Sequence, residues 1–262
     1  MTRDRAFEGA IVDLDGTVYR GRRAIEGAVE GIGHLEANGV ERVYLTNKAI
    51  HRRSVYRDLL HSFGVEVASE DVVHSAGIAA EYLAVEHPGE AVFVVGEEPL
   101  REELREARVR IATDPSEAGI VLASMDRSFS YDDLRDVLEA FESDPLFYAT
   151  NPDRTCPVED GEIPDAGAVI GAIEGLTGRS LDSVLGKPSP IALGVAAGRL
   201  GIAPENCLVV GDRLETDIRM ATSAGMTSVL VLTGVTDRAD VSRGSIEPDY
   251  VLDSLAEIDT VL

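Results

Sequence analysis

The chain has 262 residues, 44% of them hydrophobic, which is enough for one large or two smaller globular domains with a real core. Its formal net charge of −23 argues against a nucleic-acid partner, because phosphate backbones are bound by basic surfaces. No apolar run approaches the roughly 20 residues that span a bilayer, and the two cysteines lack metal-ligand spacing, so we expect a cytoplasmic protein with two free thiols and no membrane partner.

The first part of the chain alternates between strand and helix patterns. The apolar run at residues 10–12 predicts a buried strand, and residues 42–46 predict a second strand. Residues 24–37 carry aliphatic side chains at helical spacing, and residues 54–63 predict another helix.

The same alternation continues beyond residue 64. We predict strands at 91–95, 119–123, 146–149, 207–210, 228–232 and 250–252. We predict helices at 97–107, 131–141, 166–176, 189–200 and 218–224, and a loop rich in Pro, Asp and Gly at 151–165. Strands that alternate with helices in this way predict an α/β architecture with a largely parallel sheet.

Polar residues stand at the carboxyl ends of three predicted strands. Asp13 and Asp15 follow the first strand, Thr46-Asn47 ends the second, and Gly211-Asp212 ends the strand at 207–210. Ligands of open α/β sheets bind outside the carboxyl ends of the strands. We therefore expect these side chains to form a site at one edge of the sheet.

Asp13 and Asp15 are the centre of the predicted chemistry. Two acids this close repel one another, and a divalent cation with a preference for oxygen ligands, such as Mg²⁺, relieves the repulsion. Asp212 can complete such a magnesium site. Gly16 and Thr17 offer backbone N–H groups in a tight turn that can bind an anion. Taken alone, the same stretch is also compatible with a turn that caps the next segment.

Further polar positions predict contacts to a phosphate. The Thr46 hydroxyl and the amides around Asn47 can bind a phosphate oxygen, and Lys187, just before a predicted helix, can neutralise phosphate and carboxylate together. Only two of the 24 basic residues are lysines, Lys48 and Lys187. Either these positions do not suit the broad fork of arginine, or a GC-rich codon bias has left them by chance.

The chain resembles the haloacid dehalogenase (HAD) superfamily, and within it phosphatases similar to NagD and to 4-nitrophenyl phosphatases. The resemblance covers nearly the whole chain and rests on four motifs in the family order: Asp13-Leu-Asp15-Gly-Thr17, Thr46-Asn47, Lys187-Pro188, and Gly211-Asp212 with Asp217. Further similar stretches are Tyr19-Arg-Gly21, Val95-Gly-Glu-Glu98, Ala149-Thr-Asn-Pro-Asp153 and Gly186-Lys-Pro-Ser-Pro190.

The resemblance implies a magnesium-dependent phosphatase of small phosphorylated metabolites. It implies that Asp13 is a nucleophile that forms an aspartyl-phosphate, and that Asp15 is first the general acid and then the base that activates water. It implies that Mg²⁺ is held by Asp13, by the backbone carbonyl of Asp15 and by Asp212. It further implies that Thr46 and Lys187 bind the phosphoryl group. Asp217 would support either the magnesium shell or Lys187.

The resemblance also implies two domains. Residues 1–75 and 183–262 form the expected Rossmann-like core, and residues 76–182 form an inserted α/β cap that closes over the site. Within the cap loop, Asn151 and Asp153 are candidates for substrate contacts. Relatives usually carry asparagine where Lys48 stands, and we expect this lysine to favour an anionic leaving group at the substrate entrance. A homodimer is a hypothesis based on relatives whose caps pair.

Two other functions stay open at this stage. A non-catalytic sensor of phosphorylated metabolites could use the same fold, although it would need neither a nucleophile nor an acid. A phosphotransferase would use another alcohol in place of water. The physiological substrate is not identified by the sequence. The acids scattered along the chain suggest a halophilic source, because salt screens their mutual repulsion.

Overall fold

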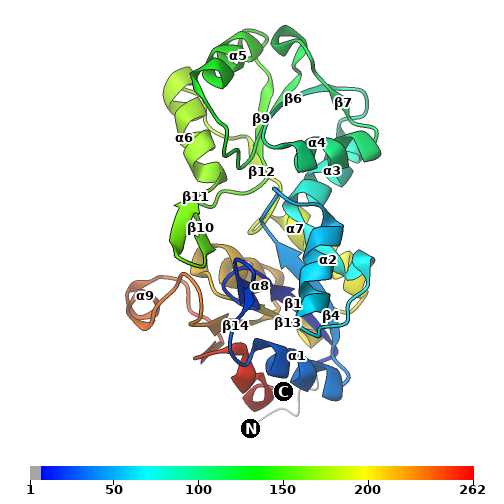
Figure 1. Ribbon diagram of the computed structural model, residues 1–262, viewed down its shortest axis with the longest axis vertical. Helices are drawn as coiled ribbons and strands as arrows, with labels where there is room; N and C mark the ends of the chain where they lie inside the picture. Colours follow the sequence, from blue (N-terminus) through cyan, green and yellow to red (C-terminus); the bar gives the residue numbers. More distant parts are fainter. Residues whose placement is uncertain (1–6) are drawn as a thin grey trace.

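The computed structural model describes residues 7–262 and consists of two α/β units stacked along the long axis of the molecule (Figure 1). One unit contains a six-stranded sheet and the other a five-stranded sheet, and every strand pair within these two sheets is parallel. The chain therefore has the predicted architecture, a Rossmann-like parallel-sheet core with an inserted α/β cap.

The six-stranded sheet has the order β15-β14-β13-β1-β4-β5. Its strands in chain order are β1 (Gly9–Asp13), β4 (Glu41–Thr46), β5 (Val72–His74), β13 (Cys207–Gly211), β14 (Thr227–Val231) and β15 (Tyr250–Leu252). Since β1 lies between β13 and β4, the three strands that end in polar residues are neighbours. Their shared carboxyl edge faces the second unit.

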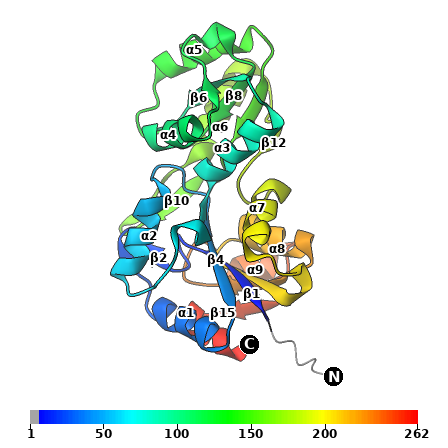
Figure 2. The same cartoon turned by 90° about the vertical axis from the view of Figure 1, so that its right-hand side faces the viewer.

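Both faces of this sheet are covered. Helices α1 (Ala28–Ala37) and α2 (Arg53–Ser62), with the C-terminal 3₁₀ turn, cover one face, and α7 (Pro190–Leu200) and α8 (Arg219–Ala224) cover the other (Figure 2). Alternate residues of β1 supply the two cores: Ala10 and Val12 point to the first face and Ile11 to the second. A short helix α9 (Arg238–Arg243) lies outside these layers.

The five-stranded sheet has the order β12-β9-β8-β6-β7. It comprises β6 (Ala91–Val95), β7 (Arg110–Ile111), β8 (Ile120–Ala123), β9 (Leu146–Ala149) and β12 (Ser183–Val184). Residues of α3 (Ser75–Glu86) and α4 (Glu98–Glu106) pack on one face, and α5 (Tyr131–Phe141) and α6 (Ala166–Thr177) pack on the other. Because β12 pairs with β9, the chain returns to the first unit only after Val184. We retain the division into a core of 1–75 with 183–262 and a cap of 76–182 as a proposal, although the pairing of β12 places residues 183 and 184 in the cap sheet.

Two segments differ from the sequence prediction. The expected loop at 151–165 contains an antiparallel hairpin of β10 (Thr155–Val158) and β11 (Gly161–Pro164), which reaches from the cap toward the core (Figure 1). The expected helix at 24–37 begins only at Ala28. Ala24, the first residue of the predicted helix, instead ends a small hairpin of β2 (Tyr19–Arg20) with β3 (Arg23–Ala24). Gly27 then takes a left-handed φ of 77°, which stops the helix from starting earlier.

Both cysteines are buried and free, as expected from the sequence. Across residues 7–262, no helix combines the length and the apolar character needed to cross a membrane.

Candidate active site

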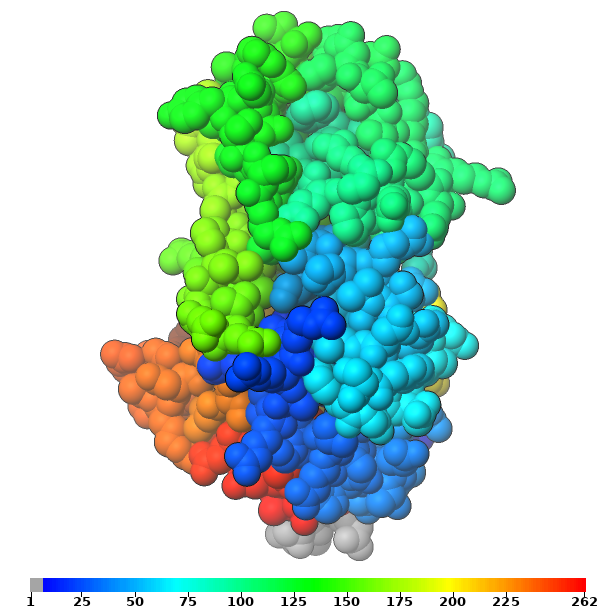
Figure 3. All heavy atoms as spheres, viewed as in Figure 1, coloured from blue at the N-terminus to red at the C-terminus, as the bar shows by residue number. Residues whose placement is uncertain are grey.

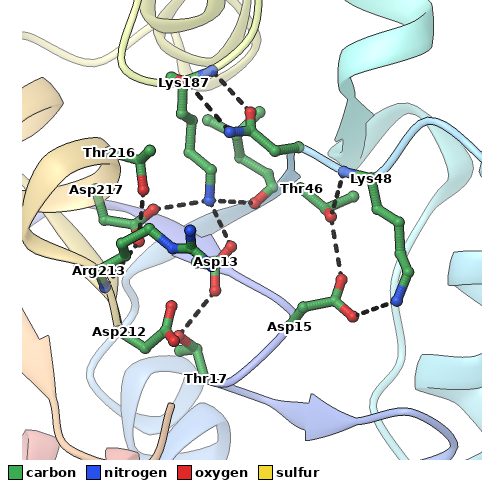
Figure 4. A network of polar contacts seen from close by, with 12 residues as sticks. Asp13, Asp15, Thr17, Thr46, Lys48, Lys187, Asp212, Arg213, Thr216 and Asp217 are labelled. Carbon is green, nitrogen blue, oxygen red and sulfur yellow. Dashed lines mark hydrogen bonds and ion pairs between the residues drawn. The ribbon is translucent and has the colours of Figure 1, made fainter. Parts of the chain in front are cut away.

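The three polar strand ends meet above the centre of the six-stranded sheet. Asp13 is the last residue of β1, Thr46 is the last residue of β4, and Asp212 directly follows β13. Figure 4 shows these side chains with Lys187, which comes from the loop that leads back from the cap to α7. The predicted site at the carboxyl edge of the sheet is therefore assembled from four separate stretches of the chain.

Lys187 connects two buried carboxylates. Its Nζ donates hydrogen bonds to the carboxylate of Asp13 and to Oδ1 of Asp217 at 2.7 Å, while the Thr17 hydroxyl donates to Oδ2 of Asp13 at 2.9 Å. Burial alone would lower the pKa of Lys187, but Asp13 and Asp217 outweigh it and raise that pKa above its ordinary value. Lys187 is therefore a permanent cation beside Asp13.

Three carboxylates at this point fit a divalent metal ion. Asp13, Asp212 and Asp217 each offer an oxygen atom, and these three atoms lie within 4.8 Å of one another. Burial, reinforced by Asp217, raises the pKa of Asp212 to about 7, and burial also raises the pKa of Asp13. When all three carboxylates are ionised, the ammonium of Lys187 balances only one of their negative charges. A cation with two charges and a preference for oxygen donors, such as Mg²⁺, matches this cluster.

Gly16 allows this close packing. Its φ of 92° lies in the left-handed region, and a Cβ at this position would lie 2.5 Å from Oδ2 of Asp212. The backbone N–H of Gly16 donates to the Tyr19 carbonyl and that of Thr17 to the Leu14 carbonyl. The two amides predicted to bind an anion are therefore engaged inside the turn, and Thr17 contacts Asp13 through its side chain instead.

Asp15 has its own set of partners, apart from the acidic cluster. Lys48 Nζ donates to Oδ1 of Asp15 at 2.8 Å, the Thr46 hydroxyl donates to Oδ2 at 3.2 Å, and the Tyr19 hydroxyl approaches the same oxygen at 3.4 Å. Both Lys48 and Asp15 are largely buried side chains. The cation expected at a substrate entrance is thus paired with Asp15 in this structure, and its preference for an anionic leaving group stays a prediction.

Asn47 links the core to the cap rather than presenting its amide to a ligand. Its Oδ1 accepts from the backbone N–H of Lys187 at 2.8 Å, and its Nδ2 donates to the Lys187 carbonyl at 3.1 Å and to Asp153 at 2.9 Å. Asn151 is fully buried and donates to the Asn47 carbonyl at 2.9 Å. These contacts fix the position of Lys187.

Arg213 is a residue that the sequence analysis does not identify. It follows Asp212, and its guanidinium donates to Oδ1 of Asp153 at 3.3 Å and to the Thr155 carbonyl at 3.0 Å. Asp153 is therefore held between Arg213 and Asn47, both from the core. The two predicted substrate contacts of the cap, Asn151 and Asp153, bond to core residues in this structure.

The β10–β11 hairpin covers the acidic cluster. Thr155, Cys156 and Pro157 line the same small cavity, of about 30 Å³, as Asp13 and Asp15. At its tip, Glu159 lies 3.3 Å from the guanidinium of Arg23, and Figure 3 shows the hairpin resting on the blue β2–β3 segment. The space holds a few water molecules at most.

Family models match two segments of the chain, and the first of them extends into the cap. A model described as haloacid dehalogenase-like hydrolase matches residues 10–110, and a HAD-hydrolase-like model matches residues 184–258. The sugar-phosphatase AraL of Bacillus subtilis is 38% identical over 250 residues, which cover 95% of this chain and 91% of that protein.

The chain belongs to the haloacid dehalogenase-like hydrolases. Two solved structures place it more closely. The p-nitrophenyl phosphatase from Archaeoglobus fulgidus superimposes with a TM-score of 0.90 at 35% identity, over 98% of this chain and 99% of that one. NagD from E. coli K-12 gives a TM-score of 0.84 at 30% identity, over 96% and 98% of the two chains. The predicted NagD-like subfamily and the assignment as a HAD-type phosphatase are confirmed. The halophilic source stays a prediction.

Proposed function

We propose that this HAD phosphatase is magnesium-dependent and works through a phosphorylated Asp13. The observation that carries the proposal is the separation of two nearby carboxylates. Asp13 lies in the buried cluster against Lys187, whereas Asp15 lies outside that cluster with Lys48, Thr46 and Tyr19. Two carboxylates in different environments suit two different roles, nucleophile and proton carrier.

In the first step, an Asp13 oxygen attacks phosphorus while the bond from phosphorus to the leaving oxygen breaks. Asp15, protonated at the start, gives its proton to that oxygen, so the product is an alcohol and an aspartyl-phosphate on Asp13. In the second step, Asp15 takes a proton from a water molecule whose oxygen attacks phosphorus. Phosphate leaves and both carboxyl groups return to their initial states.

The negative charge on the transferred phosphoryl group is neutralised in both steps. Lys187 is a buried cation in direct contact with the nucleophile, and such preorganised charges are the main source of catalysis in phosphoryl transfer. Asp13, the backbone carbonyl of Asp15 and Asp212 would hold the metal ion. When bound, Mg²⁺ would neutralise phosphoryl oxygens and the acidic cluster.

The substrate is a small phosphorylated metabolite, and sugar phosphates are the first class to test because the relative AraL is named a sugar-phosphatase. The hairpin over the site would exclude water during the first step and open for substrate and product exchange. We retain cytoplasmic location and pairing of two chains through their caps as proposals.

The test is hydrolysis of 4-nitrophenyl phosphate and of a sugar phosphate, with Mg²⁺ or with EDTA. We expect EDTA and Asp13→Asn each to abolish turnover of both substrates, and an exposed control, Asp132→Asn, to leave it unchanged. Asp15→Asn should slow the sugar phosphate far more than the aryl ester, because nitrophenolate leaves without a proton.

Three results would contradict the proposal. Equal effects of Asp15→Asn on both substrates would remove Asp15 from the role of acid. Folded wild-type protein that binds phosphate without turnover would favour the sensor, and phosphate transfer to added glycerol in preference to water would favour the phosphotransferase.

A further inference from the structure

The loop between β14 and α9 lies against the acidic cluster. β14 ends at Val231 and α9 begins at Arg238, and both elements are labelled in Figure 1. Two backbone N–H groups of the loop hold Asp212: that of Val235 donates to its Oδ2 at 2.7 Å, and that of Thr236 donates to its carbonyl at 3.2 Å. The loop therefore fixes both the side chain and the backbone of a proposed metal ligand.

The orientation of the Asp212 carboxylate decides how well the proposed site fits Mg²⁺. With Oδ2 bonded to Val235, the other oxygen, Oδ1, accepts no hydrogen bond from residues 7–262 and is free for a cation. Mg²⁺ requires nearly ideal octahedral geometry, with oxygen ligands at about 2.0–2.1 Å. A small rotation of this carboxylate is therefore enough to weaken magnesium binding.

The loop has few contacts of its own near Val235. The Thr233 hydroxyl donates to the Gly16 carbonyl at 2.7 Å, which fixes the start of the loop. The next residue, Gly234, has no side chain that could anchor it, and a Cβ there would lie 1.8 Å from Oδ2 of Asp212. The close approach of the loop thus requires a glycine, which is also the residue with the greatest backbone freedom. The shape of the loop at this point must therefore be fixed by another part of the chain.

Arg20, on strand β2, supplies this contact. Its Nε and Nη2 atoms donate to the Thr233 carbonyl at 3.1 and 2.7 Å, and Nη2 also donates to the Gly234 carbonyl at 3.1 Å. In the part of the chain that the structure describes, no other group donates to either carbonyl. The planar guanidinium holds its donors in a fixed arrangement, so these three bonds restrain the orientation of two adjacent peptide units.

A single peptide unit connects Arg20 to Asp212. The Gly234 carbonyl and the Val235 N–H belong to the same planar peptide bond. Arg20 holds the oxygen of this unit, and the N–H on its opposite side donates to Oδ2 of Asp212. Because the unit is rigid, a rotation of the peptide plane displaces the carbonyl and the N–H together. The bonds from Arg20 therefore restrain the bond to Asp212.

The charge of Arg20 has the opposite effect on a bound cation. The guanidinium donates to carbonyl oxygens and forms no ion pair with a carboxylate of residues 7–262, so its positive charge repels a divalent cation at the cluster. If only the charge mattered, removal of Arg20 would strengthen magnesium binding. If its bonds to the loop matter, removal weakens it. The two explanations predict changes of opposite sign.

We propose that Arg20 is a positioning residue for the magnesium site, which fixes the Gly234–Val235 peptide and through it the orientation of the Asp212 carboxylate. This inference rests on the proposed function, because it requires a metal ion at Asp212. It extends the support of the site to the β2–β3 hairpin, which Glu159 of the cap hairpin also contacts.

The test is calorimetric titration of the full chain, freed of metal with EDTA, with Mg²⁺ and separately with Ca²⁺. The variants are Arg20→Met, which removes the guanidinium, and Arg20→Lys, which keeps the charge but not the planar fork. The matched control is Arg22→Met. Arg22 is exposed on the same hairpin, and its side chain has no hydrogen-bond or ion-pair partner among the described residues, so the control removes the same charge without touching the loop.

We expect Arg20→Met to weaken Mg²⁺ binding about tenfold or more, the usual loss when an outer partner of a metal ligand is removed. Ca²⁺ binding should weaken less, because Ca²⁺ accepts a more flexible geometry. Arg20→Lys should lie between Arg20→Met and the wild type, and Arg22→Met should bind Mg²⁺ at least as tightly as the wild type. The melting temperature of Arg20→Met in EDTA should stay close to that of Arg22→Met.

Three results would overturn the role of Arg20. They are a Mg²⁺ affinity of Arg20→Met equal to or above that of Arg22→Met, an equal loss for Mg²⁺ and Ca²⁺, and a melting temperature in EDTA far below that of Arg22→Met. Folded wild-type protein that binds no Mg²⁺ would instead contradict the proposed function itself.

Discussion

Asp165 gives the sharpest prediction about the stability of the cap. It precedes α6, and its Oδ1 accepts one hydrogen bond from the Ala166 backbone N–H at 2.6 Å and a second from Asn151 Nδ2 at 3.4 Å. The side chain is only 4% exposed. Burial, followed by the nearby charge of Asp153, raises the pKa of Asp165 from 3.8 to about 6.

The sign of the pH effect follows from this raised pKa. Between about pH 4 and pH 6 the folded protein keeps a proton on Asp165 that the unfolded chain has lost, so the free energy of unfolding falls as the pH rises through this interval. One pKa unit corresponds to about 1.4 kcal/mol, so the whole loss is roughly 3 kcal/mol and is complete above pH 6. Asp165→Asn removes the ionisation but keeps an oxygen for the Ala166 N–H.

The measurement is urea unfolding of wild type and Asp165→Asn at several pH values. We expect the variant to be more stable at pH 7, by up to about 3 kcal/mol, and its advantage to shrink below pH 6. About 1 kcal/mol of the change falls between pH 5 and pH 6, above the isoelectric point of about 4.5 at which solubility is lowest. A stability difference that does not vary with pH would refute the assigned cause.

Three further predictions concern the core. Gly234→Ala should weaken magnesium binding at least tenfold (about 1.4 kcal/mol) in calorimetric titration, because its Cβ would lie 1.8 Å from Oδ2 of Asp212; unchanged affinity would contradict this. Gly33 lies on α1 with open space around it, so Gly33→Ala should stabilise the protein by roughly 0.5–1 kcal/mol. Gly31→Ala, on the same helix, should destabilise it because the new Cβ would lie 2.1 Å from the Leu255 carbonyl oxygen. Similar melting temperatures for the two variants would be inconsistent with this packing. Mg²⁺ at 100 times its Kd should raise the free energy of unfolding by about 2.7 kcal/mol, and EDTA should reverse the gain; a melting temperature insensitive to both would argue against a bound metal.

The parallel sheet and the meeting of distant motifs could be predicted because they depend on simple rules. Apolar runs followed by acids mark strand ends, and parallel sheets bring strand ends to one edge. Asp13, Thr46, Lys187, Asp212 and Asp217 accordingly lie together in the structure. The motifs alone do not identify the hydrogen-bond partner of each polar atom. In the structure Asn47 accepts a hydrogen bond from the Lys187 backbone N–H, and Lys48 donates one to Asp15.

The hairpin over the site was harder to predict because its sequence carries opposing signals. Pro157 disfavours a strand, and the acids around the turn suggest an exposed loop. Asp160-Gly161, however, is a typical hairpin turn sequence; in the structure Glu159 and Asp160 form the two-residue loop and Gly161 begins β11. The contact between Arg213 and Asp153 could not be predicted from sequence, because it depends on how the core and the cap pack together.

The position of β1 inside the sheet has a consequence for synthesis of the chain. β1 pairs with β4 on one side, which follows soon after it, but its other edge pairs with β13, which begins only at Cys207. The entire second sheet lies between them in the sequence. A growing chain therefore exposes the apolar edge of Gly9–Asp13 until late in translation, and unpaired edges invite association between chains. The strongly acidic character of the protein would then serve nascent chains as well, because like charges keep neighbouring copies apart.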